Sequence, residues 1–456
     1  MTTVDAAGPD AGIAAPPPGA FRKTRWSVVW LLTMTIFSAL TVGGLLAPIQ
    51  EAVKLDLGLS DFRLAMIVGS ATAIPAAILS LPIAWMVDHH TRTRLLIVLA
   101  SFWAIGTIGT AFAQDFYGLF AARLIAGVGA ATAFPVLVSL LADVCMPERR
   151  GRSMLLISIG AWAGAAAAFA IGGTLFGWLE ANPAAFIAGM APWREAHLIV
   201  GIGAAVLVLP LFLIREPARH EVEQANPGFK QALDAFWKRR AFLGWLYVGN
   251  FAGGFAEGAA ALWIGSVLVR QYGQSPGEFG GWVGLVILAS GIVGSIIGGF
   301  TADASQKLKM RGAILLPALI ATALSIPASA YPIMPSVTLF AWVLFALLLG
   351  GVVVNLVNAA AIAVLLPNEE RATSLAALAI IGKIVGGPVT AGVVAWMAVL
   401  FTGPMGLGQT LTWLGVVTGV ISLIGYWFAM RYAPAPASQL TADAPVEPER
   451  HTSHAP

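Results

Sequence analysis

The sequence predicts an all-α membrane protein with about twelve transmembrane helices. The 456-residue chain is 58% hydrophobic and only 11% charged, whereas soluble domains carry about 25% charged residues. Its apolar runs also number about twelve, and each approaches the roughly 20 residues that a helix needs to cross a bilayer. Basic residues cluster in alternate gaps between these runs. Together these observations exclude a water-soluble fold.

Lysine and arginine concentrate in every second gap, which is the pattern that cytoplasmic loops of membrane proteins show. The intervening gaps hold only Lys54, Arg63, Arg194 and Arg270. We therefore expect a multi-pass protein of the cell membrane (the inner membrane in a Gram-negative cell) with both termini in the cytoplasm. The basic clusters are Arg22, Lys23 and Arg25; Arg92 and Arg94; Arg149, Arg150 and Arg152; residues 215–240; Lys307, Lys309 and Arg311; and Arg371.

A long polar stretch divides the apolar runs into two groups of six. The groups predict helical bundles at 26–214 and 241–431, joined by a cytoplasmic linker at 215–240. The segments 1–25 and 432–456 are rich in Ala and Pro and are expected to be disordered cytoplasmic tails.

Each helix is placed on one apolar run, and each boundary on the charged or Pro/Gly-rich gap beside it. In the first bundle the runs predict helices near 26–48, 62–87, 95–113, 117–144, 153–178 and 195–214. In the second they predict helices near 241–266, 279–302, 312–331, 335–366, 372–398 and 409–431. Within the linker, the spacing of Phe229, Ala232, Leu233 and Phe236 predicts a short amphipathic helix on the inner membrane face.

Two motifs of the first bundle recur in the second. Residues 148–154 (ERRGRSM) match residues 369–375 (EERATSL), each before the fifth helix of its bundle. Ala84-x-x-x-Asp88 likewise corresponds to Gly299-x-x-x-Asp303 at the end of each second helix. Internal repeats with a binding site at their interface are typical of secondary transporters.

At these motifs the chain resembles the major facilitator superfamily, whose hallmark between helices 2 and 3 is Gly-x-x-x-Asp-(Arg/Lys)-x-Gly-Arg-(Arg/Lys). This sequence keeps Asp88 and Arg92 of that hallmark and replaces both glycines and the first basic residue. The resemblance implies a gating role for Asp88 and Arg92, with Asp143 at the inner end of the fourth helix as their partner. It implies the same role for Gly299 and Asp303 in the second copy.

A narrower resemblance is to the spinster-like branch of that superfamily and its bacterial relatives. Several short segments, most of them beside helix ends, carry it. They are residues 57–61 (LGLSD), 81–84 (LPIA), 122–129 (ARLIAGVG), 147–150 (PERR), 193–196 (WREA) and 215–219 (REPAR). This resemblance implies alternating-access transport, with lysolipid-like molecules among the substrates.

Two ionisable residues lie deep inside predicted spans. Glu257 is roughly 14 residues into the seventh helix and Lys383 roughly 11 into the eleventh, so both fall near the membrane midplane at 1.5 Å per residue. A charge at that depth costs at least about 2.5 kcal/mol, which makes each residue a functional candidate. One interpretation is a proton-coupling pair, in which a substrate anion competes for Lys383 and favours protonation of Glu257. The other is a static ion pair that fixes two helices.

Other polar and aromatic residues in the spans have two interpretations each. Arg123, early in the fourth helix, either binds an anionic substrate group or seals the outer gate, or else it extends to the outer interface. Asn355 and Asn358 share one helix face at i, i+3 and bind substrate or join helices. Trp162, which occupies the position equivalent to Lys383 in the repeat, lines the cavity or packs between helices.

The predicted function is secondary active transport of a small organic solute, anionic or amphipathic, by alternating access and with proton coupling. The alternatives are an exporter of drugs or lysolipid-like molecules and a non-transporting membrane receptor. The sequence has no Walker motif, HExxH helix or paired cysteines, so we expect no enzyme activity, no cofactor and no metal. The expected partners are the substrate, protons and the lipid bilayer, with no nucleic acid, and we expect a monomer.

Overall fold

A computed structural model describes residues 24–434 apart from 184–185, 219–235, 309, 398–399, 402 and 404. The described chain is helical, without a strand. Eleven of its helices are long and apolar enough to cross a membrane, and the helical run 61–89 lies between the first two of them. The predicted all-α class is therefore confirmed. The amphipathic helix expected in the linker falls largely on residues 219–235 and lies outside the described residues.

The first bundle starts with two broken rods followed by four unbroken helices. The rod that begins the chain continues to Asp56, beyond the predicted end at residue 48, and changes direction at Leu45. The other bounds differ from the predicted ones by a few residues. The helices are α1 (Trp26–Gly44), α2 (Leu46–Asp56), α3 (Asp61–Ala65), α4 (Ala71–His89), α5 (Arg92–Phe112), α6 (Phe116–Val144), α7 (Arg150–Ala181) and α8 (Pro192–Val208).

The second bundle differs in where it is broken, because the turn η6 (Val385–Val389) interrupts its fifth rod between α14 and α15. Short 3₁₀ turns extend the rod of α12 at both ends, and these turns account for the longer run that the sequence predicts there. The helices are α10 (Arg240–Tyr272), α11 (Pro276–Gln306), α12 (Leu316–Ala328), α13 (Val337–Leu365), α14 (Asn368–Ile384), α15 (Thr390–Met397) and α16 (Gly406–Tyr432).

Two π-helical turns face each other where the bundles meet. One, η1 (Met66–Ser70), joins α3 to α4, and the other, η6 (Val385–Val389), joins α14 to α15. A Cβ added to Gly69 would lie 2.9 Å from the carbonyl oxygen of Gly387. Glycine at this contact lets the two backbones approach closely, as packed helices do in lipid.

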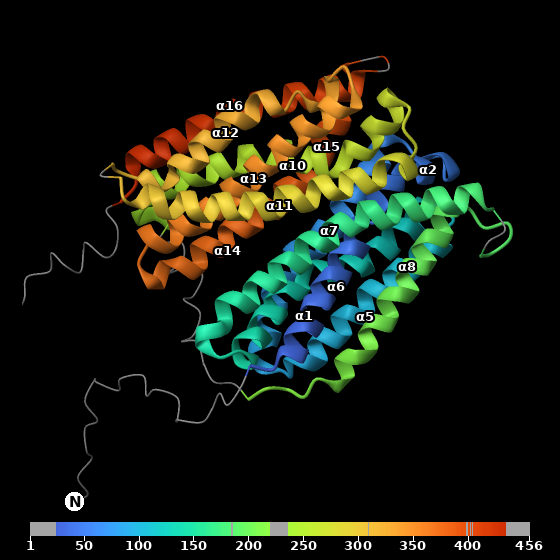
Figure 1. The fold of residues 1–456 in the computed structure, drawn as a ribbon, viewed down its shortest axis with the longest axis horizontal. Coiled ribbons are helices and arrows are strands. Elements are labelled where there is room, and N and C mark those ends of the chain that lie inside the picture. Colours follow the sequence, from blue (N-terminus) through green and yellow to red (C-terminus); the bar gives the residue numbers. More distant parts are fainter. Residues whose placement is uncertain are drawn as a thin grey trace, which may run out of the picture.

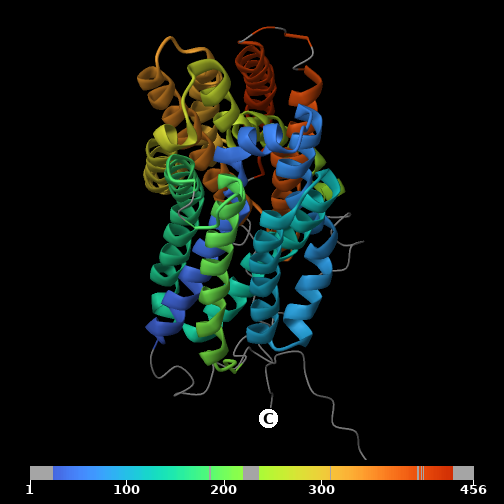
Figure 2. The ribbon, with the colours of Figure 1, turned by 90° about the vertical axis from the view of Figure 1, so that its right-hand side faces the viewer.

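The bundles also pack together along α7 and α11. A Cβ on Gly173 would lie 2.3 Å from the carbonyl oxygen of Pro276, and a Cβ on Gly280 would lie 2.8 Å from the Cα of Gly173. These contacts are near the end of the molecule that carries α2, which we call the closed end. The opposite end is where α1, α5 and α7 begin. Figure 1 shows the two bundles one above the other, with α2 and α15 at the closed end on the right. In Figure 2 the closed end faces the viewer and α2 crosses between the bundles.

Candidate functional site

Glu257 lies halfway along α10 and lines a cavity of about 340 Å³. Its Oε2 accepts a hydrogen bond from Nδ2 of Asn355 on α13 at 3.2 Å. A Cβ on Gly351 would lie only 2.2 Å from the carboxyl carbon of Glu257, so glycine at 351 makes room for the carboxylate. The side chain is thus held between two helices and presented to the cavity.

The cavity wall opposite Asn355 is formed by α14 and the turn η6. Gly382 and Gly386 line it, and Lys383 stands between them in the helix. A Cβ on Gly258 would lie 2.8 Å from the Cα of Gly386, so α10 and η6 pack backbone to backbone beside the cavity. The side chain of Lys383 lies outside the described residues. The predicted Glu257–Lys383 pair therefore stays a prediction.

Arg123 does not line this cavity. Its guanidinium is buried and donates to the carbonyl oxygens of Val42 at 3.2 Å and Gly43 at 2.6 Å, at the end of α1. Its Nε has no hydrogen-bond partner among the described residues. Arg123 is thus attached to the break between α1 and α2, and its side chain does not extend to a solvent-exposed interface.

Asn358 and Trp162 also contact other helices instead of the cavity. Asn358 is fully buried and donates to Asn250 Oδ1 at 3.1 Å and to the Tyr426 hydroxyl at 2.8 Å, so it joins α13 to α10 and α16. The indole of Trp162 lies over Gly291 of α11, where an added Cβ would come within 2.3 Å of the ring. The structure thus places only Asn355 of the predicted uncharged residues beside Glu257.

Two of the predicted gating residues of the first bundle, Arg92 and Asp143, form a buried ion pair. Arg92 donates from Nη1 to the carboxylate of Asp143 and from Nε to Oε1 of Glu216 at 2.9 Å. Glu216 also accepts from the backbone N–H of Thr93 at 2.8 Å. The cluster ties α5 and α6 to the segment that follows α8, all within one bundle. The side chain of Asp88 lies outside the described residues.

The second copy of the gating motif has different surroundings. Asp303 is exposed and has no ion pair among the described residues, and a Cβ on Gly299 would meet no atom within 4 Å. The described ion pair at this end of the second bundle joins Arg239 to Glu370 at 2.5 Å. The motif is therefore repeated in the sequence of the second bundle, but its described residues do not form the ion pairs seen in the first.

A polar cluster at the closed end was not anticipated from the sequence. Arg270 of α10 donates from both terminal nitrogens to Asp61, at 3.0 and 2.6 Å, and from Nη2 to Glu51 at 2.7 Å. Lys54 pairs with Asp61 at 2.6 Å, and Gln50 donates to the carbonyl oxygen of Leu262 at 2.7 Å. Gln50 also donates to the hydroxyl of Ser266, which itself donates to Glu51. We call Gln50, Glu51, Lys54, Asp61, Ser266 and Arg270 the closed-end clamp.

The closed-end clamp contains every hydrogen bond and ion pair between described residues of the two bundles. Its charges balance, because two acids face two bases. The sequence did contain a sign of this cluster. Lys54 and Arg270 are among the few basic residues in the less basic gaps, and the acids Glu51 and Asp61 lie in the same gap as Lys54.

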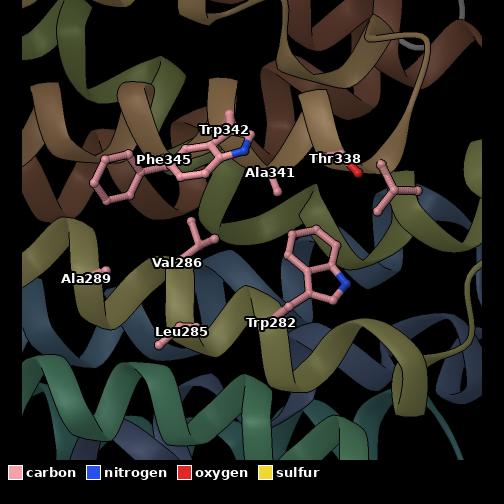
Figure 3. A pocket seen from close by; sticks show the side chains of 9 residues that line it. Trp282, Leu285, Val286, Ala289, Thr338, Ala341, Trp342 and Phe345 are labelled. Atoms are coloured by element: carbon pink, nitrogen blue, oxygen red, sulfur yellow. The ribbon is translucent and has the colours of Figure 1, made fainter.

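A separate apolar groove runs along the outside of the second bundle, between α11 and α13 (Figure 3). It has a volume of about 530 Å³ and is lined by Trp282, Leu285, Val286, Trp342 and Phe345, among others. The described lining residues include no charged side chain, and Leu285 and Trp342 are largely exposed. Such a surface suits contact with lipid chains more than binding of a polar solute.

Comparisons with known proteins agree on one family. The family model described as Major Facilitator Superfamily matches residues 31–391. The chain is 24% identical over 414 residues to the "MFS-type efflux pump" of Mycolicibacterium smegmatis, covering 89% of this chain and 93% of the relative. It is 25% identical over 316 residues to the "Probable sulfoacetate transporter SauU" of Cupriavidus necator, covering 65% and 70%. It is 24% identical over 397 residues to the "Cis,cis-muconate transport protein" of Acinetobacter baylyi, covering 84% and 90%.

Among solved structures, the fold is similar to that of a bacterial homolog of the human lysosomal transporter spinster. That structure is described as inward-facing and unoccupied. The TM-score is 0.77 at 20% sequence identity, and the match covers 91% of this chain and 98% of the other.

Proposed function

Because this chain belongs to the major facilitator superfamily, we propose that it moves a small organic anion across the membrane by alternating access, coupled to protons through Glu257. The relatives described above are transporters, not enzymes. Two of them are named for organic acids, sulfoacetate and cis,cis-muconate. An anionic solute is therefore the first substrate class to test.

The observation that carries the proposal is the carboxylate of Glu257 in a cavity within the membrane-spanning region. Its described partner is an uncharged amide, Asn355. An ionised carboxylate at that depth is costly when it has no cationic partner. Binding of a proton removes the charge, so the occupancy of the cavity and the protonation of Glu257 depend on each other.

Lys383 supplies the link to the substrate in this mechanism. A lysine at that position attracts either the Glu257 carboxylate or a substrate anion. When the anion takes the lysine, Glu257 loses a stabilising charge and takes up a proton. The proton then leaves when the cavity opens to the other side and the anion departs.

The direction in which the cavity faces follows from the basic loops. If the basic gaps are cytoplasmic, the closed end with α2 is on the outer side and the described conformation faces inward. The clamp then closes the outer entrance, and both termini lie in the cytoplasm. Exchange of conformations requires the clamp to break and the opposite ends of the bundles to meet.

The proposal is tested in proteoliposomes with an imposed pH gradient, using radiolabelled sulfoacetate and cis,cis-muconate as probes. We expect gradient-driven accumulation of at least one of them by the wild-type protein and its loss in Glu257→Gln. Glu180→Gln, at the exposed end of α7, is the matched control and should keep it. Unchanged accumulation in Glu257→Gln would sink the coupling assignment.

Efflux of an amphipathic molecule is the second candidate. The similarity to an efflux pump along 89% of this chain favours it. The same proteoliposomes, loaded with a fluorescent cationic drug, distinguish the two. Gradient-dependent release of the drug without accumulation of either anion would favour efflux.

A further inference from the structure

Glu257 also borders a second and smaller cavity, on the side of α12 and α16. This cavity has a volume of about 30 Å³ and is lined by three hydroxyl residues, Thr322 and Ser325 of α12 and Ser329 directly after it. A space of that size holds one or two water-sized particles. We call it the hydroxyl chamber. Its lining shares Gly253, Glu257 and Val354 with the main cavity, so the Glu257 carboxylate stands between the two spaces.

The hydroxyl groups present oxygen lone pairs to the chamber. Ser325 donates its hydrogen to the carbonyl oxygen of Ala321, and Ser329 donates to that of Ser325, both at 2.9 Å. A hydroxyl has a single hydrogen, so what remains at each serine is acceptor capacity. The described residues of the chamber include no Lys, Arg or His. A carboxylate and hydroxyl oxygens without a cationic side chain form an acceptor-rich site.

Glycines leave the space that this site occupies. A Cβ on Gly351 would lie 2.2 Å from Oε1 of Glu257, and a Cβ on Gly415 would lie 2.6 Å from Oγ of Ser329. Any larger residue at either position would displace one of the oxygens. The buried Thr322 adds a third hydroxyl to the lining of the chamber.

Among the described residues, Tyr426 is the other titratable group with an electrostatic interaction with Glu257. The Tyr426 hydroxyl on α16 accepts a hydrogen bond from Asn358. Lys383 follows Gly382, which lines the main cavity, and its side chain lies outside the described residues. From α12 and α13, the described groups facing Glu257 are hydroxyls and the Asn355 amide. The charge that a ligand meets in the chamber is therefore that of Glu257.

We propose that the hydroxyl chamber binds a sodium ion when Glu257 is ionised, with the Glu257 carboxylate as the charged ligand and the hydroxyls of Thr322, Ser325 and Ser329 as neutral ones. Hard cations take carboxylate and neutral oxygen ligands together. The inference rests on the proposed role of Glu257 and adds a second ion that competes with the proton for its carboxylate. A cation in the chamber neutralises the carboxylate from behind, so an anion can enter the main cavity in front of it.

The test measures the thermal unfolding of the purified full-length protein without substrate. One arm compares sodium chloride with choline chloride at equal ionic strength, and the other compares pH 6 with pH 8 without sodium. A ligand that binds only the folded state raises the midpoint, and we expect a rise of at least about 3 °C in the sodium arm. A rise with sodium identifies sodium as the ligand, whereas a rise on acidification alone reports protonation of Glu257 and rejects sodium in the chamber.

The variants decide whether the response comes from the chamber. We expect Glu257→Gln to abolish it and Ser329→Ala to increase the half-saturating cation concentration about tenfold, as loss of one ligand to a charge does. Ser325→Ala is a second variant in case Ser329→Ala folds poorly. Ser295→Ala in α11 is the matched control, because its hydroxyl also donates to a helix carbonyl four residues back but lies outside the chamber.

No response to sodium would overturn the chamber assignment, and so would a sodium response that persists in Glu257→Gln or is unchanged in both serine variants. The transport assay tests the proposed function independently of the chamber. Loss of the cation response with intact gradient-driven uptake rejects only the chamber. A retained cation response with no uptake of any probe rejects only the proposed transport function.

Discussion

The two ends of the bundle pair use charge differently. At the closed end, Arg270 of one bundle contacts Glu51 and Asp61 of the other. At the opposite end, Arg92 contacts Asp143 and Glu216 within its own bundle. Ion pairs between bundles hold one conformation, whereas ion pairs within a bundle move with it as a rigid body. The difference indicates which contacts must break during a change of conformation and which must persist.

Arg92→Gln is expected to have the largest effect, and on stability alone. It leaves the buried Asp143 carboxylate without its arginine, and removing one partner of a buried pair costs about 3 kcal/mol or more. We expect that loss in the free energy of unfolding, measured by denaturant titration in detergent. Arg94→Gln, at an exposed position two residues further along α5, is the control.

The same variant should leave the closed end in place. Spin labels at Leu55 of α2 and Met405 before α16, in a Cys145→Ser background, report the distance between the bundles there. An increase of that distance in Arg92→Gln would contradict the distinction between the two ends.

Arg270→Ala is expected to have the next largest effect, and this effect is on the balance between conformations. It leaves Glu51 and Asp61 without the cation that joins them across the bundles. We expect the population with a separated closed end to rise about tenfold, equivalent to about 1.4 kcal/mol. The Leu55–Met405 distance distribution measures it. The control is Arg63→Ala, which removes a cation 5.5 Å from the Phe116 ring at the same end of the first bundle.

Gly173→Ala tests whether close helix contact also holds the closed end. The added methyl would overlap the carbonyl oxygen of Pro276, so α7 and α11 must separate slightly. We expect a cost of about 1–2 kcal/mol in the closed conformation, seen as partial lengthening of the same distance. Gly281→Ala, with no atom within 4 Å of the added carbon, should change nothing. Equal effects of the two substitutions would rule out a specific contact.

Glu216→Gln is expected to have the smallest effect, which appears only in how the free energy of unfolding depends on pH. Burial acts to raise the pKa of its carboxyl, but hydrogen bonds from Thr93 and Arg92 hold that pKa below its ordinary value. The stabilisation is therefore complete above about pH 4.3, the ordinary value for glutamate, and is lost as the pH falls through the lowered pKa.

Unfolding measured from neutral pH down through this range should lose stability more steeply in the wild type than in Glu216→Gln. Glu180→Gln should behave as the wild type does. Parallel pH profiles for the wild type and Glu216→Gln would show that the Glu216 contacts contribute nothing.

Much of this organisation can be predicted from the sequence. Apolar runs gave helix positions that agree within a few residues with most observed bounds, because a membrane-spanning segment must satisfy its own backbone hydrogen bonds. Depth along the helix singled out Glu257 as well, since rise per residue is constant. The closed-end clamp was missed because Glu51 and Asp61 lie in ordinary short gaps, and their meeting with Arg270 depends on how two distant bundles pack.

The directions of the individual side chains were decided by the tertiary structure. Asn355 and Asn358 are three residues apart on α13, yet one contacts Glu257 at the cavity and the other is buried against α10 and α16. Helices in lipid are apolar on all sides, so their periodicity does not distinguish a face toward a cavity from a face toward a neighbour. The sequence by itself therefore determined the all-α membrane class and the approximate positions of most helices. Only the packing of the helices decided which polar groups meet, because each such meeting joins residues that are distant in the chain.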